Sequence, residues 1–132
     1  MDCFTGWIGY HRPSLDNTEF VKNYELYLPQ HIQTWKDFTK RKGKYFAHTV
    51  APGFDNSYSW GGPQIPLPRS SEKFAERFKI TINFLDNVYK EIRIDTWNDF
   101  GEWSYIEPTK EEGFSYLFEL RRLLTNFIKT IA

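Results

Sequence analysis

The chain of 132 residues carries 17 basic and 17 acidic side chains, so its formal net charge is zero. No global field therefore directs it to nucleic acid or to an anionic membrane surface, and no apolar run approaches the ~18 residues that a membrane span requires. One cysteine, Cys3, excludes an internal disulfide, and three histidines without ligand spacing give no zinc site. We therefore expect one domain over residues 1–132, without a metal or other cofactor and without nucleic-acid or membrane partners.

The N-terminal segment has no basic stretch followed by an apolar one. A chain that starts at Met1 is therefore expected to lack a signal peptide and to be cytoplasmic, and the compartment stays open if these residues are part of a longer protein. Residues 3–8 are rich in aromatic and β-branched side chains, which predicts a first strand.

A long helical segment is predicted over residues 17–42. Pro29 is expected to break or restart it, because proline lacks the amide hydrogen and clashes with the preceding turn. Beyond Pro29, apolar residues recur at helical spacing. The predicted buried face consists of Ile32, Trp35 and Phe38.

A second strand is predicted over residues 45–50, followed by a loop over residues 51–70 that holds four of the seven prolines. Loops longer than about 12–15 residues are usually functional or disordered, and this loop has too many aromatic residues for disorder. Ser70 or Ser71 then caps a helix. Its predicted apolar face consists of Phe74, Phe78, Ile82 and Leu85.

A third strand is predicted over residues 91–96, and the last helix comes after it. Thr109, with Glu112 three residues later, has the spacing of a capping box and predicts the start of that helix. The apolar stripe of the helix is formed by Leu117, Leu120, Leu124, Phe127 and Ile131.

Strands that alternate with helices in this way predict an α/β fold, with a parallel sheet of three βα units and right-handed crossovers. In such folds the functional loops leave the carboxyl ends of the strands. The loops that follow residues 8, 50 and 96 are therefore expected to lie on one edge.

The loop after the third strand carries two carboxylates, Asp99 and Glu102, between Trp97, Phe100 and Trp103. Paired carboxylates carry out glycoside hydrolysis, and aromatic rings offer flat apolar faces to a sugar. The alternative is a solvated loop in which the carboxylates are paired by chance beside buried aromatic residues. The spacing alone does not decide between these interpretations.

Two motifs in order resemble a known family: Pro52-Gly53-Phe54-Asp55-Asn56, then Trp97-Asn98-Asp99-Phe100-Gly101-Glu102 followed by Ile106-Glu107-Pro108. They resemble the C-terminal part of glycoside hydrolase family 99, and also the related barrel family of polysaccharide-biosynthesis loci that is labelled glycosyltransferase-like. The resemblance covers most of the chain. It implies the last part of a (βα)8 barrel that acts on α-mannoside-type linkages without a metal.

The resemblance also implies roles for individual residues. Asp99 would take the proton from the 2-hydroxyl group of the sugar, and Glu102 would protonate the leaving oxygen. The residues expected to contact the sugar are Asp55, Asn56, Tyr58, Trp60, Trp97, Asn98 and Trp103. For Asp55, an Asx-turn in the Pro-Gly loop is an equally weighted alternative.

Two departures from the family pattern matter. Asp99 stands where the family mostly has Glu, and three βα units are fewer than the eight that close a barrel. The chain is therefore expected to be a glycoside hydrolase-like enzyme, or part of one. The alternative is a non-catalytic remnant that binds glycan or serves as an oligomerisation module. Because open sheet edges need cover, we expect either a homo-oligomer or a missing N-terminal barrel half as partner, with carbohydrate as the ligand.

Overall fold

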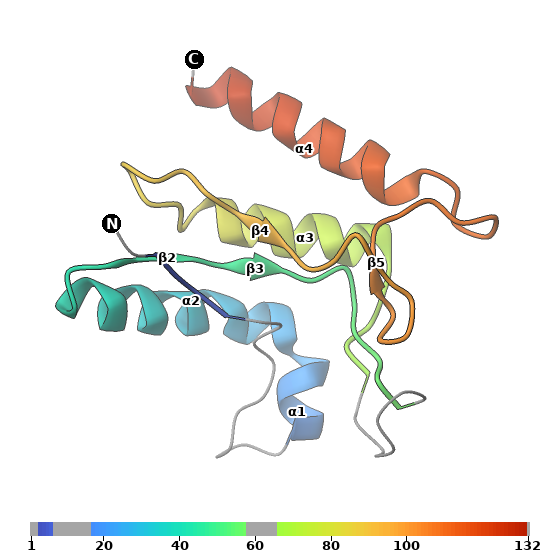
Figure 1. The fold of residues 1–132 in the computed structure, drawn as a ribbon, viewed down its shortest axis with the longest axis horizontal. Helices are drawn as coiled ribbons and strands as arrows, with labels where there is room; N and C mark the ends of the chain where they lie inside the picture. The colour runs from blue at the N-terminus through green and yellow to red at the C-terminus, as the bar shows by residue number, and fades with distance from the viewer. Residues whose placement is uncertain (1–2, 7–16, 58–65, 132) are drawn as a thin grey trace.

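The computed structural model describes residues 3–6, 17–57 and 66–131 (Figure 1). These described residues form four helices and six short strands. They are β1 Cys3–Thr5, α1 Asn17–Lys22, α2 Tyr24–Arg41, β2 Tyr45–Ala47, β3 Thr49–Val50, α3 Ser71–Ile82, β4 Arg93–Ile94, β5 Asn98–Asp99, β6 Ser104–Tyr105 and α4 Ser115–Ile131.

The first four strands pair in parallel, as predicted, but not as one three-stranded sheet. β1 pairs with β2, so that Cys3 lies opposite Tyr45, and β3 pairs with β4, so that Thr49 lies opposite Arg93. The expected sheet is thus replaced by two-stranded sheets. The reason is that β1 and β4 are staggered along the segment 45–50. β1 pairs with its first half, and β4 pairs with its second half.

Helices α2, α3 and α4 return along the strands, so each starts at the edge where the strands end, whereas α1 runs steeply to them (Figure 1). α2 packs against β2, and α3 packs against β3 and α4. The buried apolar residues form two clusters. The first consists of Val21, Tyr24, Leu28, Ile32, Ala51, Phe54 and Leu67. The second consists of Val50, Phe74, Ala75, Phe78, Ile106, Tyr116 and Leu123.

The expected break at Pro29 is wrong, because α2 continues through it. The interruption lies at Asn23 instead, whose backbone and side-chain amides both donate to the Glu19 carbonyl, at 3.1 and 3.0 Å. Pro29 removes one amide hydrogen near the start of the helix, and burial of Leu28 and Ile32 on either side offsets that loss.

The face predicted for α2 is right only at Ile32. Trp35 and Phe38 are partly exposed, and Trp35 stacks on Phe46 at 5.9 Å between ring centroids. The buried positions are Tyr24, Leu28, Ile32 and Thr39. Trp35 lies at the flank of that face, where its ring contacts Phe46 of β2 and Phe38 of its own helix.

The start of α3 is confirmed, since the Ser70 side chain accepts the Lys73 amide at 3.1 Å. Its apolar face is confirmed at Phe74 and Phe78, which are buried, whereas Leu85 lies beyond the end of the helix.

The predicted start of the last helix is wrong. The Glu112 amide does donate to Thr109 Oγ1 at 3.0 Å, as in a capping box. That bond closes a separate turn, because Gly113 follows with a φ of 56° and α4 begins only at Ser115. Within the described part of the chain, no helix is long and apolar enough to cross a membrane.

Candidate functional site

The predicted carboxylate segment forms a hairpin directly after β4. β5 and β6 pair antiparallel, so that Asp99 lies opposite Ser104. Two bonds tie the hairpin to the end of β4: the Thr96 amide donates to the Ser104 carbonyl at 2.9 Å, and Ser104 Oγ donates to the Asp95 carbonyl at 2.7 Å. The hairpin is therefore fixed at the edge where the parallel strands finish (Figure 1).

Asp99 and Glu102 are both half-buried in this hairpin. The Asp99 amide donates to Thr96 Oγ1 at 2.9 Å, and Asp99 Oδ1 accepts the Glu102 amide at 3.1 Å. One carboxylate oxygen of Asp99 thus closes the turn that presents Glu102. This bond fixes the backbone positions of the two residues relative to each other, and their catalytic roles stay a prediction.

The loop after β3 meets the hairpin. The Asp55 amide donates to the Glu102 carbonyl at 2.8 Å, so the two sequence motifs lie side by side. Asp55 Oδ1 accepts from the Ser57 amide at 3.0 Å and from Ser57 Oγ at 2.6 Å. This is the Asx-turn that the sequence left open, and a sugar contact by Asp55 stays a prediction. Next to it, Asn56 Oδ1 is buried without a hydrogen-bond partner among the described residues.

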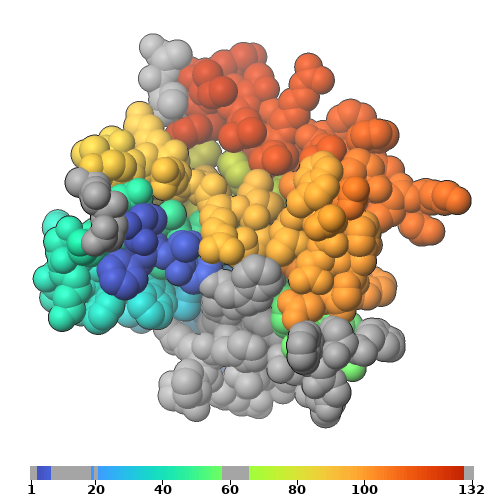
Figure 2. Space-filling model, in the orientation of Figure 1, coloured from blue at the N-terminus to red at the C-terminus, as the bar shows by residue number. Residues whose placement is uncertain are grey.

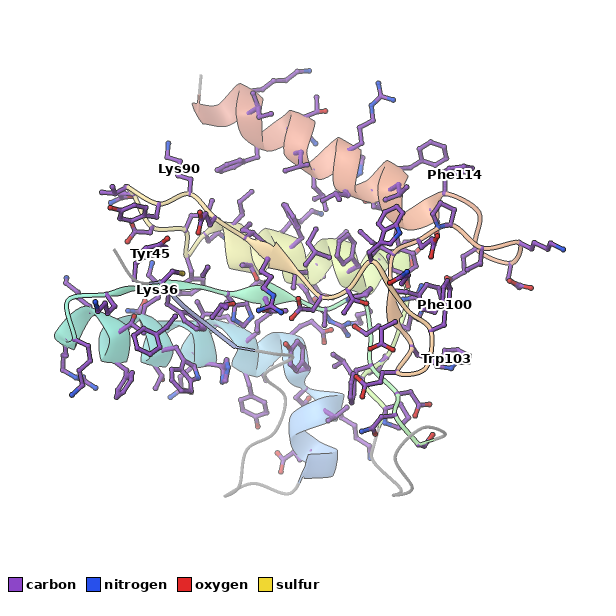
Figure 3. All side chains as sticks on the ribbon, viewed as in Figure 1. Lys36, Tyr45, Lys90, Phe100, Trp103 and Phe114 are labelled. Atoms are coloured by element: carbon purple, nitrogen blue, oxygen red, sulfur yellow. The ribbon has the colours of Figure 1, made fainter. Side chains whose placement is uncertain are left out.

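Exposed aromatic residues surround the carboxylates. Trp97 is 50% exposed and Trp103 49%, with Phe100 similarly exposed and packed on Tyr105 at 4.4 Å. Figure 3 shows Phe100 and Trp103 at the end of the molecule opposite Lys90 and Tyr45. Asn98 is exposed in the same hairpin. The predicted sugar contacts Tyr58 and Trp60 lie outside the described residues.

Trp103 has a φ of 51°, which is rare for a large side chain. The left-handed region costs a non-glycine residue about 1–2 kcal/mol. A residue kept in this conformation at an exposed position is typical of a site where strain serves a function.

A buried arginine, Arg69, supports the hairpin from below. Its guanidinium donates to the Tyr105 carbonyl at 2.5 Å and to Glu112 Oε2 at 2.6 Å. It also lies 3.7 Å from the centre of the Tyr105 ring. Gly53 allows this arrangement, because a Cβ there would lie 2.5 Å from Arg69 Cβ. The structure thus pairs Arg69 with the carboxylate of Glu112.

A second buried arginine, Arg77, holds the loop that follows β3. It donates to the carbonyls of Ala51 and Pro52, each at 3.2 Å, and pairs with Glu25 at 2.8 Å. Sequence reasoning missed this residue. The available signal was a charged side chain three positions after Phe74, on the apolar face of α3.

Burial changes the electrostatics at the end of β4. It raises the pKa of Asp95, an effect that the Arg93 guanidinium opposes from 2.7 Å. Burial also raises the pKa of Tyr105, against the opposite influence of Arg69 beneath it. Among the described residues, no group of three His, Cys, Asp or Glu side chains could hold a metal ion.

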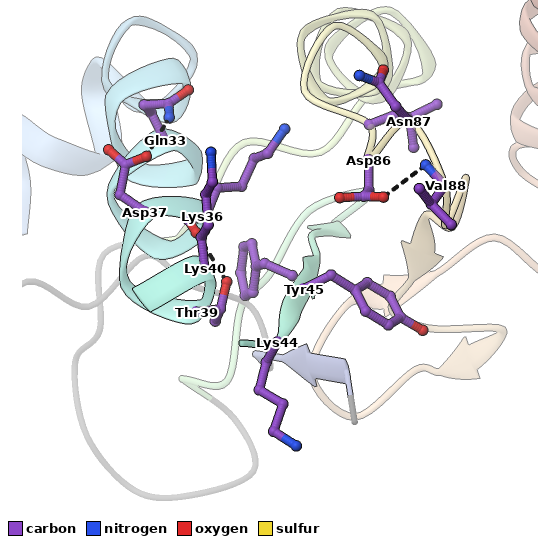
Figure 4. A pocket seen from close by; sticks show the side chains of 12 residues that line it. Gln33, Lys36, Asp37, Thr39, Lys40, Lys44, Tyr45, Asp86, Asn87 and Val88 are labelled. Carbon is purple, nitrogen blue, oxygen red and sulfur yellow. Dashed lines mark hydrogen bonds between the residues drawn. The ribbon is translucent and has the colours of Figure 1, made fainter. Parts of the chain in front are cut away.

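A hollow of about 470 Å³ lies at the opposite edge, between the end of α2 and the segment after α3 (Figure 4). Several of its polar groups bond to one another or to the backbone. Lys36 Nζ donates to the Phe84 carbonyl at 2.6 Å, Gln33 donates to Asp37 at 2.8 Å, and Asp86 accepts the Val88 amide at 2.8 Å. This hollow contains none of the predicted site residues.

Comparison with known proteins identifies the fold. No family model and no curated protein matches the chain. Among solved structures, a glycoside hydrolase-like protein matches 83% of this chain and 34% of its own, at 11% identity and a TM-score of 0.72. Two structures of the GH99 endo-α-mannosidase of Bacteroides thetaiotaomicron match 98% of this chain, at 17% and 18% identity and TM-scores of 0.56 and 0.55.

The fold is similar to that of glycoside hydrolase family 99. The resemblance predicted from the motifs is therefore confirmed at the level of the fold. The chain spans 34% to 41% of the length of these matched chains.

Proposed function

We propose that this chain carries the carboxylate-bearing edge of a glycoside hydrolase-like site that acts on α-mannosidic bonds. The observation that carries the proposal is the hairpin. It holds Asp99 and Glu102 at the edge where the strands end, beside exposed indoles, in a fold similar to an endo-α-mannosidase. Sugar-binding sites combine such aromatic faces with a few polar groups.

The proposed chemistry uses both carboxylates. Asp99 takes the proton of the 2-hydroxyl group, and the resulting oxygen forms a bond to the anomeric carbon as the glycosidic bond breaks. Glu102 gives its proton to the leaving oxygen. It later takes one from the water that adds to the anomeric carbon and opens the anhydro-sugar, while Asp99 returns its proton to the 2-oxygen. Because Asp99 is one methylene shorter than Glu, the hydrogen bond from the Glu102 amide supports the proposal by fixing where its carboxylate lies.

The sugar is proposed to lie on Trp97 and Trp103, with Asn98 as an orienting contact. Asn56 supports a contact from the neighbouring loop, because its buried Oδ1 lacks a hydrogen-bond partner among the described residues. Asp55, Tyr58 and Trp60 are proposed to complete the pocket from that loop.

A second candidate function is a glycan-binding or oligomerisation module without turnover. One observation favours it: Asp99 Oδ1 is engaged in the turn, where it accepts the Glu102 amide. We propose in either case that residues 1–132 form one (βα)3 domain whose open side is covered by a second copy or by a further barrel segment. Exposed apolar residues of α4, Phe118, Leu124 and Ile128, support such a partner. Light scattering that reports a monomer at high concentration would contradict the homo-oligomer.

The test of the function compares Asp99→Asn and Glu102→Gln with the parent chain, using hydrolysis of α-mannosides and binding to a glycan array. General acid–base groups contribute about 10²- to 10⁴-fold to rate, so either variant should lose turnover by that factor while glycan binding persists. Glu119→Gln is the control, because its carboxylate lies on exposed α4 and pairs with Arg122.

Each outcome distinguishes the two candidates. Turnover in the parent that both variants lose supports the enzyme. Glycan binding without turnover in the parent supports the binding module. If the parent binds and cleaves no glycan, both carbohydrate functions are wrong.

A further inference from the structure

Among the described residues, no helix packs on one face of the paired strands. Thr49 lies opposite Arg93 in the ladder, and Asp95 follows two residues later, so all three share one face. Val50 and Ile94 alternate with them and join the cluster under the helices. Figure 2 views the molecule with β1 and the segment around β4 at the surface, while α3 is almost wholly hidden behind them.

Asp95 is the unusual member of this helix-free face. Its side chain is 5% exposed, and Oδ1 accepts from Arg93 Nε at 2.7 Å. Oδ2 is buried and has no hydrogen-bond partner among the described residues, because the neighbouring Thr49 hydroxyl donates to the Gly6 carbonyl at 2.6 Å. Buried polar atoms almost always have a partner, so an unpaired carboxylate oxygen indicates a group that acquires one.

Asp95 also stands next to the candidate site. Its carbonyl accepts the Ser104 hydroxyl of the hairpin, and the following residue, Thr96, accepts the amide of Asp99 through Oγ1. On the same face, Arg93 lines an open hollow of about 530 Å³ together with Thr5 and Ala47. The carboxylate therefore lies where the hairpin meets the helix-free face of the strands.

The charges around Asp95 define the ligand. Arg93 already neutralises the carboxylate through Oδ1. Lys90 and Glu91 line the same hollow as Arg93, so no net negative charge is left there. A cation is therefore disfavoured, and a neutral donor such as a hydroxyl group fits Oδ2 best. Because Oδ1 is already bonded to Arg93, Oδ2 of Asp95 is the oxygen that can accept a hydroxyl group of a polyhydroxylated ligand.

We propose that Asp95 is a specificity-determining residue that accepts one hydroxyl group of the sugar through Oδ2, while Arg93 holds Oδ1. This inference rests on the proposed carbohydrate function of the hairpin. It extends the site from Asp99 and Glu102 onto the helix-free face, to a residue that neither motif includes. The hydroxyl bound by Asp95 then distinguishes the accepted sugar from analogues that lack it.

The experiment pairs a protein variant with deoxygenated ligands. A set of α-linked mannobiosides is titrated into the parent chain by calorimetry. The monodeoxy derivatives of the tightest-binding disaccharide are then titrated in the same way. One derivative should bind about 10- to 100-fold more weakly, since a hydrogen bond to a charged group is lost. Asp95→Asn should lower the affinity for the unmodified disaccharide by a similar factor. Removing the same hydroxyl group from the ligand should then have no further effect on binding to this variant.

Thermal unfolding separates this role from a structural one. Asn keeps the size of the side chain and removes the buried charge, so Asp95→Asn should unfold at the same temperature as the parent or higher. Asp95→Ser, which loses the carboxylate but keeps a hydroxyl, serves as a second variant. Glu119→Gln on α4 controls for loss of a carboxylate elsewhere and should bind unchanged.

The outcomes are distinguishable from those of the proposed function. If Asp95→Asn and Asp95→Ser bind all mannobiosides like the parent while Trp97→Ala does not, the Asp95 inference is overturned and the carbohydrate function stands. Weakening by the same factor for every derivative would also overturn it, since it shows no pairing with one hydroxyl. If the parent binds no mannobioside, the proposed function and the inference both fail.

Discussion

The two faces of the segment from Tyr45 to Val50 show two different uses of one strand. Phe46, His48 and Val50 face the helices, where Phe46 stacks on Trp35 and the His48 ring lies 6.0 Å from that of His31. The alternating residues share their face with Arg93 and Asp95. One face is filled by aromatic and aliphatic side chains, and the other carries an ion pair.

Burial shifts the pKa of one titratable group on each face, and the two shifts have opposite directions. It lowers the pKa of His48 to about 3, and His31 adds to that effect. It raises the pKa of Asp95. Both shifts favour the neutral form, as desolvation must. Only Asp95 has a counter-charge at 2.7 Å, so the helix-free face retains an ion pair, whereas the helix-covered face holds a neutral imidazole.

The largest expected effect comes from breaking the helix-covered side at Arg77. Arg77→Met removes the donor to the Ala51 and Pro52 carbonyls and leaves Glu25 without its guanidinium. Removing one partner of a buried ion pair costs about 3–5 kcal/mol. Urea unfolding should report a loss of that size. Arg122→Met, from an exposed pair on α4, should cost less than about 1 kcal/mol, and an equal loss in the two variants would contradict this account.

A smaller effect is expected from the pH dependence that His48 imposes. In the unfolded chain a histidine has a pKa of about 6.5, whereas the pKa of folded His48 is about 3. Stability from His48 is therefore complete above about pH 6.5 and falls as the pH is lowered towards 3. Between pH 7 and pH 5 the loss is about 2 kcal/mol.

His48→Leu tests this dependence, because it removes the titrating group from the helix-covered face. Urea unfolding of the parent and the variant at pH 7 and pH 5 should show the loss in the parent alone. His31→Gln should keep most of the dependence, since burial is the larger cause of the shift. A parent whose stability is flat over this range would show that His48 reaches solvent.

The smallest effect concerns Trp103 on the hairpin. Trp103→Gly removes a large side chain from a φ of 51°, which glycine adopts freely, and should stabilise the protein by about 0.5 kcal/mol. Trp97→Gly is the matched control, with similar exposure, and should destabilise it by about 0.5–1 kcal/mol. Both should weaken glycan binding. Destabilisation by Trp103→Gly would show that the indole contributes packing that outweighs the strain.

Local sequence signals predicted the order of elements well where one residue decides an element. Ser70 caps α3 because its side chain reaches the Lys73 amide, an interaction across three residues. The signal at Thr109 was equally local, and its hydrogen bond does form. It failed to start a helix because Gly113 turns the chain and because Glu112 gives its carboxylate to Arg69, which is distant in sequence.

The candidate site divides in the same way. The pair Asp99 and Glu102, the aromatic residues around it and the Pro-Gly-Phe-Asp motif could be read from the sequence, because each lies within a short run. The support from Arg69 and Arg77, and the isolation of Asp95 Oδ2, could not be read in advance. Each depends on which backbone carbonyls and carboxylates of other segments come within hydrogen-bond distance.

The sequence by itself determined the succession of strands and helices, the cap of α3 and the residue types that the hairpin presents, because these follow from periodicity and from contacts a few residues apart. Tertiary structure decided the rest. It carried α2 through Pro29, because burial of Leu28 and Ile32 outweighs one missing amide bond. It split the expected sheet at His48, because the neighbouring strands are staggered along it. It also joined the Asp55 loop to Glu102 through a single backbone hydrogen bond, since only the folded chain brings residues so far apart in sequence together.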